Sequence, residues 1–297
     1  MAIKTAKATI NGQDYTLTLN ASTGNYEATI TAPSKSSYTL AGHYYPVTIK
    51  VTDTAGNTTT KDATDATLGA SLRLVVKEKV APVSVFTYPT AGSAIITNKP
   101  TFKWKVTDND SGVNPDTIGI TIDSGSKITS GITKTAITGG YECSYTPTTA
   151  LSDGSHTVKV DATDFDGNAS TQVSVQFKID TVPPTLTLSN PADGLVTNNK
   201  SLTVSGTTND ATSSPVTVKV NGTAVTVGSN GTFSTTITLV EGSNTITVVA
   251  TDSAGKSSTV TRKVTLDTKA PTISAVTLTP NPVDGGKTFI ISVKVSD

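Results

Sequence analysis

Hydrophobic and polar residues alternate with a period of two along most of the chain. Every second residue is Val, Phe or Ile in residues 173–179, and residues 216–220 follow the same rule with Val. Phe102, Trp104 and Val106 form a similar row. Such alternation is typical of strands with one buried face and one exposed face. The sequence therefore predicts an all-β fold and places its lone Trp in a hydrophobic core.

One turn motif recurs along the chain and indicates an internal repeat. Residues 52–57, 163–168 and 251–256 each begin with Thr-Asp at the end of an alternating segment and turn through Gly. Asp accepts hydrogen bonds from the turning backbone, and Gly adopts a positive φ without strain. A repeated hairpin of this kind predicts tandem copies of one small domain.

Proline-containing junctions follow each repeat and suggest the domain boundaries. Pro82, Pro183 and Pro271 each come shortly after the last alternating segment of a repeat. Proline lacks an N–H and fixes φ, so it ends a sheet and stiffens the connection. We therefore expect a semi-rigid, extended rod of β-sandwich domains. The expected boundaries are residues 1–80 (domain one), 81–182 (domain two), 183–269 (domain three) and 270–297 (the terminal segment).

Composition and charge limit the classes of function that the sequence supports. Only 15% of the residues are charged, and 23 Lys and Arg balance 23 Asp and Glu, so nucleic-acid binding is disfavoured. No stretch approaches the roughly 20 apolar residues of a membrane span, and the first residues lack the apolar core of a signal peptide. We expect no membrane insertion. Cys143 is the single cysteine, which excludes an intrachain disulfide, and the alternation around it predicts a buried strand thiol.

Domain three carries a family resemblance. Residues 218–222 read VKVNG, residues 230–233 read NGTF, residues 241–248 read EGSNTITV and residues 250–255 read ATDSAG. This pattern resembles bacterial immunoglobulin-like domains, and the resemblance extends over nearly the whole chain. It implies tandem immunoglobulin-like β-sandwiches, which occur in bacterial surface proteins and in bacteriophage tail or other virion proteins. The opening and the order of the repeats resemble phage or prophage tail-associated members.

The first and last repeats are shorter than domain three. Residues 8–12 align with 218–222, and residues 47–53 align with 246–252, so domain one is expected to start at strand C. At the other end, 26 positions separate Pro82 from Asp108 and also Pro271 from Asp297. The terminal segment is therefore expected to contain only strands A and B.

A two-stranded fragment is marginal in water, so the terminal segment needs a partner. We hypothesise that it completes an open sheet in another copy or in a neighbouring protein. Its expected contact residues are Phe289, Ile291, Val293 and Val295. Alternatively, the segment folds back on domain three, or the chain is truncated there. Residues 34–45 and 62–70 are a further alternative, because they could complete domain one internally.

The acidic loops contain the one group of residues in the sequence whose spacing suits a metal site. The candidate calcium ligands are Asp108, Asp110, Asp161, Asp164 and Asp166, all in domain two. Calcium prefers six to eight oxygen ligands, which Asp, Asn and backbone carbonyls in a turn can supply. Asp180 or Asp267, at a junction, could add another oxygen. The alternative is that these Asp residues serve turns and solubility.

Catalytic motifs are missing from the sequence. His43 and His156 are the only histidines, and neither has metal-site spacing. We expect a non-catalytic phage or prophage virion component, a tail fibre or tail decoration. Its expected partners are other virion proteins or copies of itself, and also cell-surface glycans of the host. The alternative is a secreted bacterial adhesin or carbohydrate-binding accessory stalk, located outside the cell or on its surface.

Overall fold

The computed structural model describes residues 2–297, and its regular elements are strands apart from two short 3-10 helices. The predicted all-β class is confirmed. One compact unit comprises the residues up to Ser93 with Lys99–Ile179, and the other comprises Ala94–Asn98 with Asp180–Asp297. No helix within residues 2–297 is long and apolar enough to cross a bilayer. The four-part division of the sequence stays a prediction, and its domain names are kept below.

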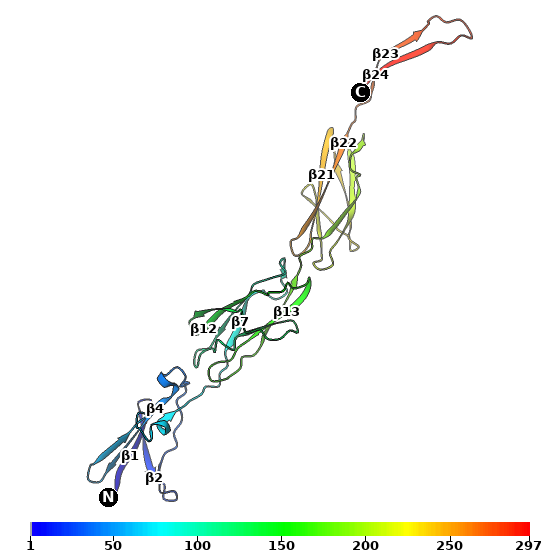
Figure 1. The fold of residues 1–297 in the computed structure, drawn as a ribbon. Helices are drawn as coiled ribbons and strands as arrows, with labels where there is room; N and C mark the ends of the chain where they lie inside the picture. The colour runs from blue at the N-terminus through cyan, green and yellow to red at the C-terminus, as the bar shows by residue number, and fades with distance from the viewer. Residues whose placement is uncertain (1) are drawn as a thin grey trace. The chain divides into compact units, whose positions relative to one another are not determined.

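Domain one is built on one antiparallel sheet (Figure 1, blue). Its elements are β1 (Ile3–Ile10), β2 (Gln13–Leu19), β3 (Tyr26–Glu27), β4 (Tyr45–Asp53), β5 (Thr58–Lys61) and β6 (Arg73–Leu74), with 3-10 helices at Ala41–His43 and Gly69–Leu72. The sheet order is β3-β2-β1-β4-β5, and β6 pairs with β4.

Long connections cover part of this sheet. Ile10, Tyr45 and Val76 are buried together, and Leu40 and Leu74 pack against them. The Tyr45 hydroxyl donates a hydrogen bond to the Lys35 carbonyl at 3.2 Å. Domain one thus buries apolar surface with its own residues. Leu40 and Tyr45 lie in the stretch 34–45 suggested by the sequence, whereas Leu74 and Val76 lie outside the suggested stretch 62–70. Internal completion of domain one by these two stretches stays a prediction.

Domain two is a sandwich of two sheets. The first has the order β11-β12-β9-β7, and in the second β13 lies between β10 and β14. The strands are β7 (Val83–Tyr88), β8 (Ala94–Ile95), β9 (Phe102–Thr107), β10 (Gly119–Ile122), β11 (Thr133–Ile137), β12 (Gly140–Tyr145), β13 (Gly154–Asp161) and β14 (Val173–Ile179). The ring of Phe102 meets that of Phe177 edge-on at 5.5 Å between centroids. Trp104 is 1% exposed, so its predicted core position is confirmed.

Domain three has a second pair of sheets around a separate core. Its strands are β15 (Thr185–Asn190), β16 (Leu195–Thr197), β17 (Ser201–Asn209), β18 (Thr217–Val220), β19 (Thr223–Val225), β20 (Thr232–Thr238), β21 (Gly242–Thr251) and β22 (Ser257–Leu266). The sheet orders are β15-β17-β20 and β16-β22-β21-β18-β19. Inward residues of both sheets, among them Val204, Val218 and Ile246, are almost fully buried.

Domain one reproduces one of these two sheets. Its order β2-β1-β4-β5 corresponds to β19-β18-β21-β22, which agrees with the alignment of residues 8–12 with 218–222. The sequence also aligns residues 24–26 with 231–233, but the short strand β3 pairs differently from β20. Phe233 lies in β20 and pairs with β17, whereas Tyr26 pairs with β2. Domain one offers β3 no equivalent of β17, so β3 forms a hairpin with the preceding strand instead.

The terminal segment forms a hairpin of β23 (Thr272–Thr279) and β24 (Ile290–Ser296) (Figure 1, red). Its pairing of Thr272 with Ser296 matches that of Val83 with Thr107 and that of Thr185 with Asn209. Each of the three hairpins also contains a register shift. The terminal hairpin therefore pairs like the first two strands of domains two and three at both ends, but its register shift after Ile273 comes two residues earlier than the equivalent shifts after Phe86 and Leu188.

Candidate functional site

Three carboxylates gather where domain one meets domain two. Glu78, Asp108 and Asp164 are all buried, and each offers a carboxylate oxygen within 4.8 Å of the others. Asp108 follows β9, Asp164 lies in the turn after β13, and Glu78 follows β6. Two of the five sequence-predicted calcium ligands, Asp108 and Asp164, are thus brought together, and Glu78 joins them.

Asp108 and Asp164 also hold their own turns. Asp108 Oδ1 accepts hydrogen bonds from the N–H of Asp110 at 2.9 Å and of Gly112 at 2.8 Å. Asp164 accepts from the backbone N–H and the side-chain amide of Asn168, at 2.7 and 2.6 Å. Both Asp side chains therefore stabilise turns, which is the role that the alternative interpretation of the acidic loops gives them.

Glu78 connects the two domains. Its Oε1 accepts hydrogen bonds from the N–H and the hydroxyl of Ser111, at 3.0 and 2.9 Å. The Glu78 N–H donates to Asp166 Oδ2 at 2.9 Å, and the Asn168 amide donates to the Glu78 carbonyl at 3.2 Å. Sequence analysis missed Glu78, although its place shortly before the Pro82 junction is a usable signal, since Asp180 stands similarly before Pro183.

The other predicted ligands lie outside this cluster. Asp110 Oδ1 accepts a hydrogen bond from the Ser36 N–H at 3.0 Å, so Asp110 joins domain two to domain one. Asp161 is bonded to Lys127 and to the Gln172 amide. Because Val158 and Val160 point into the core, the period of two places Asp161 on the opposite face of β13.

An aromatic stack accompanies these polar contacts. The ring of Tyr38 lies on that of Phe165 at 4.2 Å between centroids and 9° between planes, and His43 stacks with Tyr38 at 4.3 Å. Because the stack, the Asp110 bond and the Glu78 bonds all join the same two domains, several independent contacts hold domain one against domain two.

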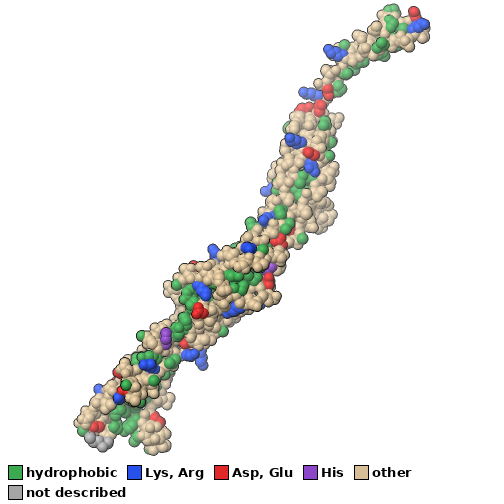
Figure 2. All heavy atoms as spheres, viewed as in Figure 1, with side chains coloured by type: hydrophobic (Ala, Val, Ile, Leu, Met, Phe, Trp, Pro, Cys, Tyr) green, Lys and Arg blue, Asp and Glu red, His purple; other side chains and the backbone are tan. Residues whose placement is uncertain are grey.

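The terminal hairpin exposes apolar side chains. Phe289, Ile291, Val293 and Val295 are 47, 58, 48 and 60% exposed. The counterparts of Ile291, Val293 and Val295 in β9 are Phe102, Trp104 and Val106, which β12 and the facing sheet bury almost completely. In residues 2–297, β24 pairs only with β23, so its other edge carries no strand. Figure 2 shows hydrophobic side chains along this segment, at the upper right.

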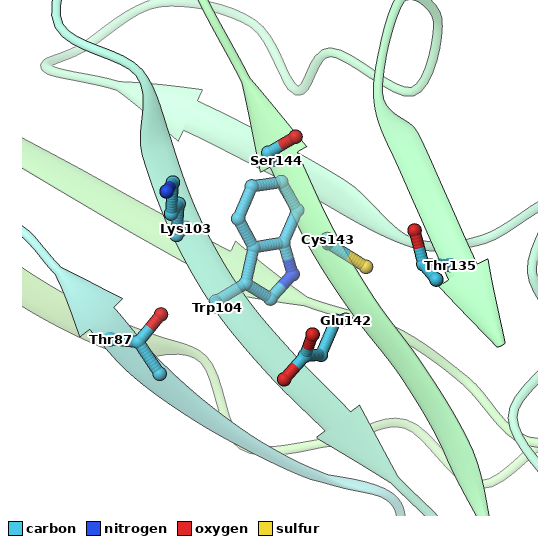
Figure 3. A pocket seen from close by; sticks show the side chains of 7 residues that line it. All are labelled: Thr87, Lys103, Trp104, Thr135, Glu142, Cys143 and Ser144. Atoms are coloured by element: carbon cyan, nitrogen blue, oxygen red, sulfur yellow. The ribbon is translucent and has the colours of Figure 1, made fainter. Parts of the chain in front are cut away.

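A hollow of about 320 Å³ lies over β9 and β12 (Figure 3). Its lining comprises Thr87, Lys103, Trp104, Thr135, Glu142, Cys143 and Ser144. Burial raises the pKa of the Cys143 thiol to about 11, and the side chain is 4% exposed. The thiol stays protonated at neutral pH and is a poor nucleophile, so the predicted buried strand position of Cys143 is confirmed.

His156 serves the fold of domain two. Its Nδ1 lies 2.8 Å from Asp123 Oδ2, and its Nε2 lies 2.7 Å from the Ser152 carbonyl oxygen. Burial lowers the pKa of the ring, but the bonds to Asp123 and Ser152 outweigh burial, so the pKa lies above its ordinary value. Both neighbours are acceptors, which favours the imidazolium because it donates from both nitrogens.

Known families match domains two and three. Residues 90–181 match the family model of the bacterial Ig-like domain, and residues 184–268 match that of domain B of glucodextranase. Each match falls on one sandwich of the structure. These are tandem immunoglobulin-like domains. The resemblance of the sequence to bacterial immunoglobulin-like domains is thereby confirmed at the level of the domain.

Individual relatives are similar over parts of their length. Bacillopeptidase F of Bacillus subtilis (strain 168) is 33% identical over 126 residues, which cover 42% of this chain and 9% of that protein. Among solved structures, the I-band fragment I67-I69 from titin covers 89% of this chain and 88% of its own, with 15% identity and a TM-score of 0.40. Fibronectin(III)-like modules of Clostridium thermocellum CbhA cover 62% of this chain and 94% of theirs, with 20% identity and a TM-score of 0.36.

Proposed function

We propose that this chain is a non-catalytic structural and adhesive array of immunoglobulin-like domains. The observation that carries the proposal is the contact around Glu78, where buried hydrogen bonds and the Tyr38–Phe165 stack hold domain one on domain two. Contacts of this kind transmit force from one repeat to the next. A spacer or stalk requires that property, and an isolated binding domain does not.

The polar groups of the described residues support a non-catalytic role. The carboxylates near Glu78 accept hydrogen bonds from turns and from the neighbouring domain, and His156 is bonded on both ring nitrogens. The Cys143 thiol is buried with a raised pKa. These groups are already engaged in folding, so none of them is poised as an acid, base or nucleophile.

Within that class, the setting that we propose is a phage or prophage virion, as a tail fibre or tail-associated decoration. The support is the resemblance of the opening and of the order of repeats to tail-associated proteins. The proposed partners are other virion proteins or copies of this chain, with glycans of the host surface as the adhesive target.

A second setting is an accessory region of a secreted or surface protein of bacteria. Two observations favour it: the model that matches residues 184–268 is a domain of glucodextranase, and the similar stretch in bacillopeptidase F is 9% of that protein. In both cases the similar stretch is one part of a named protein, and bacillopeptidase F is a protein of Bacillus subtilis. The structural and adhesive role is the same in either setting.

Immunolabelling of particles distinguishes the two settings. Antibodies against the full chain are applied to density-purified particles from an induced culture of the source strain and to the cells and medium of an uninduced culture. Label on tails, absent from uninduced medium, is the result expected for a virion component. Label on cells or in the medium without particles would reject the virion setting and support the accessory region.

Binding to a glycan array tests the adhesive role separately. The array carries host-wall polysaccharides, and the full chain is compared with a heat-unfolded sample of the same chain. Retention of the folded chain alone is the expected result. Equal signals, or none with any polysaccharide, would remove the adhesive role and leave the structural one.

A further inference from the structure

A second carboxylate cluster lies at the start of domain three and includes Asp180, one of the last residues of domain two. Asp180, Asp210 and Asp252 each offer an oxygen within 4.8 Å of the others. Asp180 directly follows β14, Asp210 directly follows β17, and Asp252 lies in the turn between β21 and β22. The sequence suggested Asp180 as an addition to the acidic loops of domain two, whereas the structure places it with two residues of domain three.

Two oxygens of this cluster are buried without a partner. Asp180 Oδ1 accepts a hydrogen bond from the Val182 N–H at 3.2 Å, and Asp252 Oδ1 accepts from Ala254 and Lys256. The other oxygen of each residue, Oδ2, is buried and has no hydrogen-bond partner within residues 2–297. Asp180 is 0% exposed and Asp252 is 6% exposed. Water therefore does not reach these oxygens from the surface.

Ser213 adds a third oxygen of the same kind. Its hydroxyl is buried and has no hydrogen-bond partner among the described residues. The Ser213 N–H donates to Asp210 Oδ1 at 2.6 Å, and its carbonyl accepts from the Ser253 N–H at 3.0 Å. Ser213 thus connects the loop of Asp210 to the turn of Asp252, beside the carboxylate cluster.

Buried negative oxygens without donors are unfavourable, and three neighbouring carboxylates repel one another. A divalent cation removes both penalties. Calcium binds oxygens at 2.3–2.6 Å, so two ligand oxygens of one ion can be up to about 5 Å apart, and the oxygens of this cluster all lie within 4.8 Å of one another. The donors are all oxygens, which calcium prefers. We propose that Asp180, Asp210 and Asp252 form a calcium site, with the Ser213 hydroxyl as a further ligand.

The spacing of these residues recurs along the chain. Thirty positions separate Asp180 from Asp210, and the same number separates Glu78 from Asp108 and Asp267 from Asp297. Asp164 and Asp252 occupy the same Thr-Asp turn of successive repeats. The cluster of Glu78, Asp108 and Asp164 is therefore the counterpart of this site in domain two. There, Ser111 already donates to Glu78, so the proposal rests on domain three.

Binding would fix the start of domain three. Asp180 precedes β15, while Asp210 and Asp252 belong to the body of the sandwich. An ion shared by all three would tie residues 180–184 to the two loops. Its removal would leave Asp180 and Asp252 repelling each other, so we expect the three segments to open more often without calcium.

Hydrogen exchange measured by mass spectrometry tests the site in the full chain. The chain is treated with a chelator, dialysed, and compared with and without calcium at about 10 mM. If the dissociation constant lies in the 10⁻⁴–10⁻³ M range of extracellular calcium modules, exchange through local opening should slow about 10- to 100-fold. The effect is expected in peptides that contain residues 180–184, 210–214 and 252–256. Magnesium at the same concentration should have a smaller effect.

Matched variants make the test specific. Asp180→Asn and Asp252→Asn keep the Oδ1 acceptor and replace the unpartnered oxygen, and both should abolish the protection by calcium. Asp53→Asn is the control, because Asp53 holds the same turn in domain one and belongs to neither cluster. It should leave the protection intact. Equal exchange with and without calcium in the unmodified chain, or protection that survives in both cluster variants, would overturn the proposal.

Discussion

Tyr38 of domain one lies flat on Phe165 of domain two, with the ring planes 9° apart. Phe165 sits in the repeated Thr-Asp turn, directly after Asp164. The turn that closes a hairpin of domain two therefore also supplies the aromatic contact to domain one. In domain three the same position is Ser253, which has no ring. The backbone N–H of both residues donates to a neighbouring loop, from Phe165 to the Gly112 carbonyl and from Ser253 to the Ser213 carbonyl. One turn motif thus supports different contacts in successive repeats.

The stack should contribute measurably to the coupling of the two domains. We expect a double-mutant cycle with Tyr38→Ala and Phe165→Ala to give an interaction free energy of about 0.5–1.5 kcal/mol, typical of aromatic pairs. Urea denaturation of the four chains provides the free energies of unfolding. Strictly additive effects would show that the rings do not stabilise each other.

Replacing Glu78 should cost more than replacing an exposed glutamate. Glu78→Ala leaves the N–H and the hydroxyl of buried Ser111 without their acceptor, a loss of about 1–3 kcal/mol. Glu142→Ala is the control. Glu142 is half-exposed and pairs with Lys105 at 2.8 Å, a surface ion pair worth less than about 1 kcal/mol. Denaturant midpoints measure both, and equal losses would argue against the role of Glu78 between the domains.

His156 should make the stability of domain two depend on pH. The folded state raises the pKa of the ring above its ordinary value of 6.5, so protonation favours folding. The stabilisation is complete below the pKa of the unfolded chain and is lost as the pH rises through the higher pKa of the folded state. The contribution of His156 to the free energy of unfolding should therefore fall over the interval from pH 6.5, the ordinary pKa, up through the higher pKa of the folded state.

His156→Gln isolates this effect, because Gln does not titrate. We expect the difference in free energy of unfolding between the original chain and the variant to shrink as the pH rises over that interval. Urea denaturation at several pH values gives the difference. A constant or growing difference would contradict the assignment of the pKa rise to Asp123 and Ser152.

Removing the terminal hairpin should leave domain three intact. Every residue of β23 and β24 is exposed, so the hairpin contributes little buried surface to the sandwich. A chain that ends at Thr272 should unfold within about 0.5 kcal/mol of the full chain in the transition of domain three. A larger loss would show that the hairpin folds back on domain three.

The same pair of chains tests strand complementation between copies. If β24 completes a sheet in another copy, light scattering of the full chain should show mass that grows with concentration, and the chain ending at Thr272 should stay monomeric. Equal masses of the two chains at every concentration would reject that partner. Domain one provides only part of an open sheet, because Leu40 and Val76 already pack against Ile10 and Tyr45 of that sheet.

Local patterns predicted the fold well. The alternation at Phe102, Trp104 and Val106 identified a buried strand, since a period of two determines which face a side chain occupies. The Thr-Asp turns were found for a similar reason: Asp53 and Asp252 accept hydrogen bonds from residues two and four positions later, within a single short segment. Interactions between residues a few positions apart produce a pattern that can be recognised in the sequence.

Contacts between distant segments were harder to predict. Glu78 meets Asp108 and Asp164 only because two domains touch, and no local pattern records that meeting. Asp161 is close to Asp164 in sequence, yet it lies on the exposed face of β13 and bonds to Lys127 and Gln172. Asp180 was recognised as a junction residue, but its partners in domain three depend on how the strands are connected.

Force spectroscopy of single full-length chains tests the central claim, that this is an array of separately folded, force-bearing immunoglobulin-like domains. Pulling from both ends should give discrete unfolding peaks. Domains two and three should each release a contour length of roughly 300 Å, since a domain of about 90–100 residues extends by about 3.3–3.6 Å per residue. Extension without resolved peaks, or one event that releases the whole chain, would contradict the account.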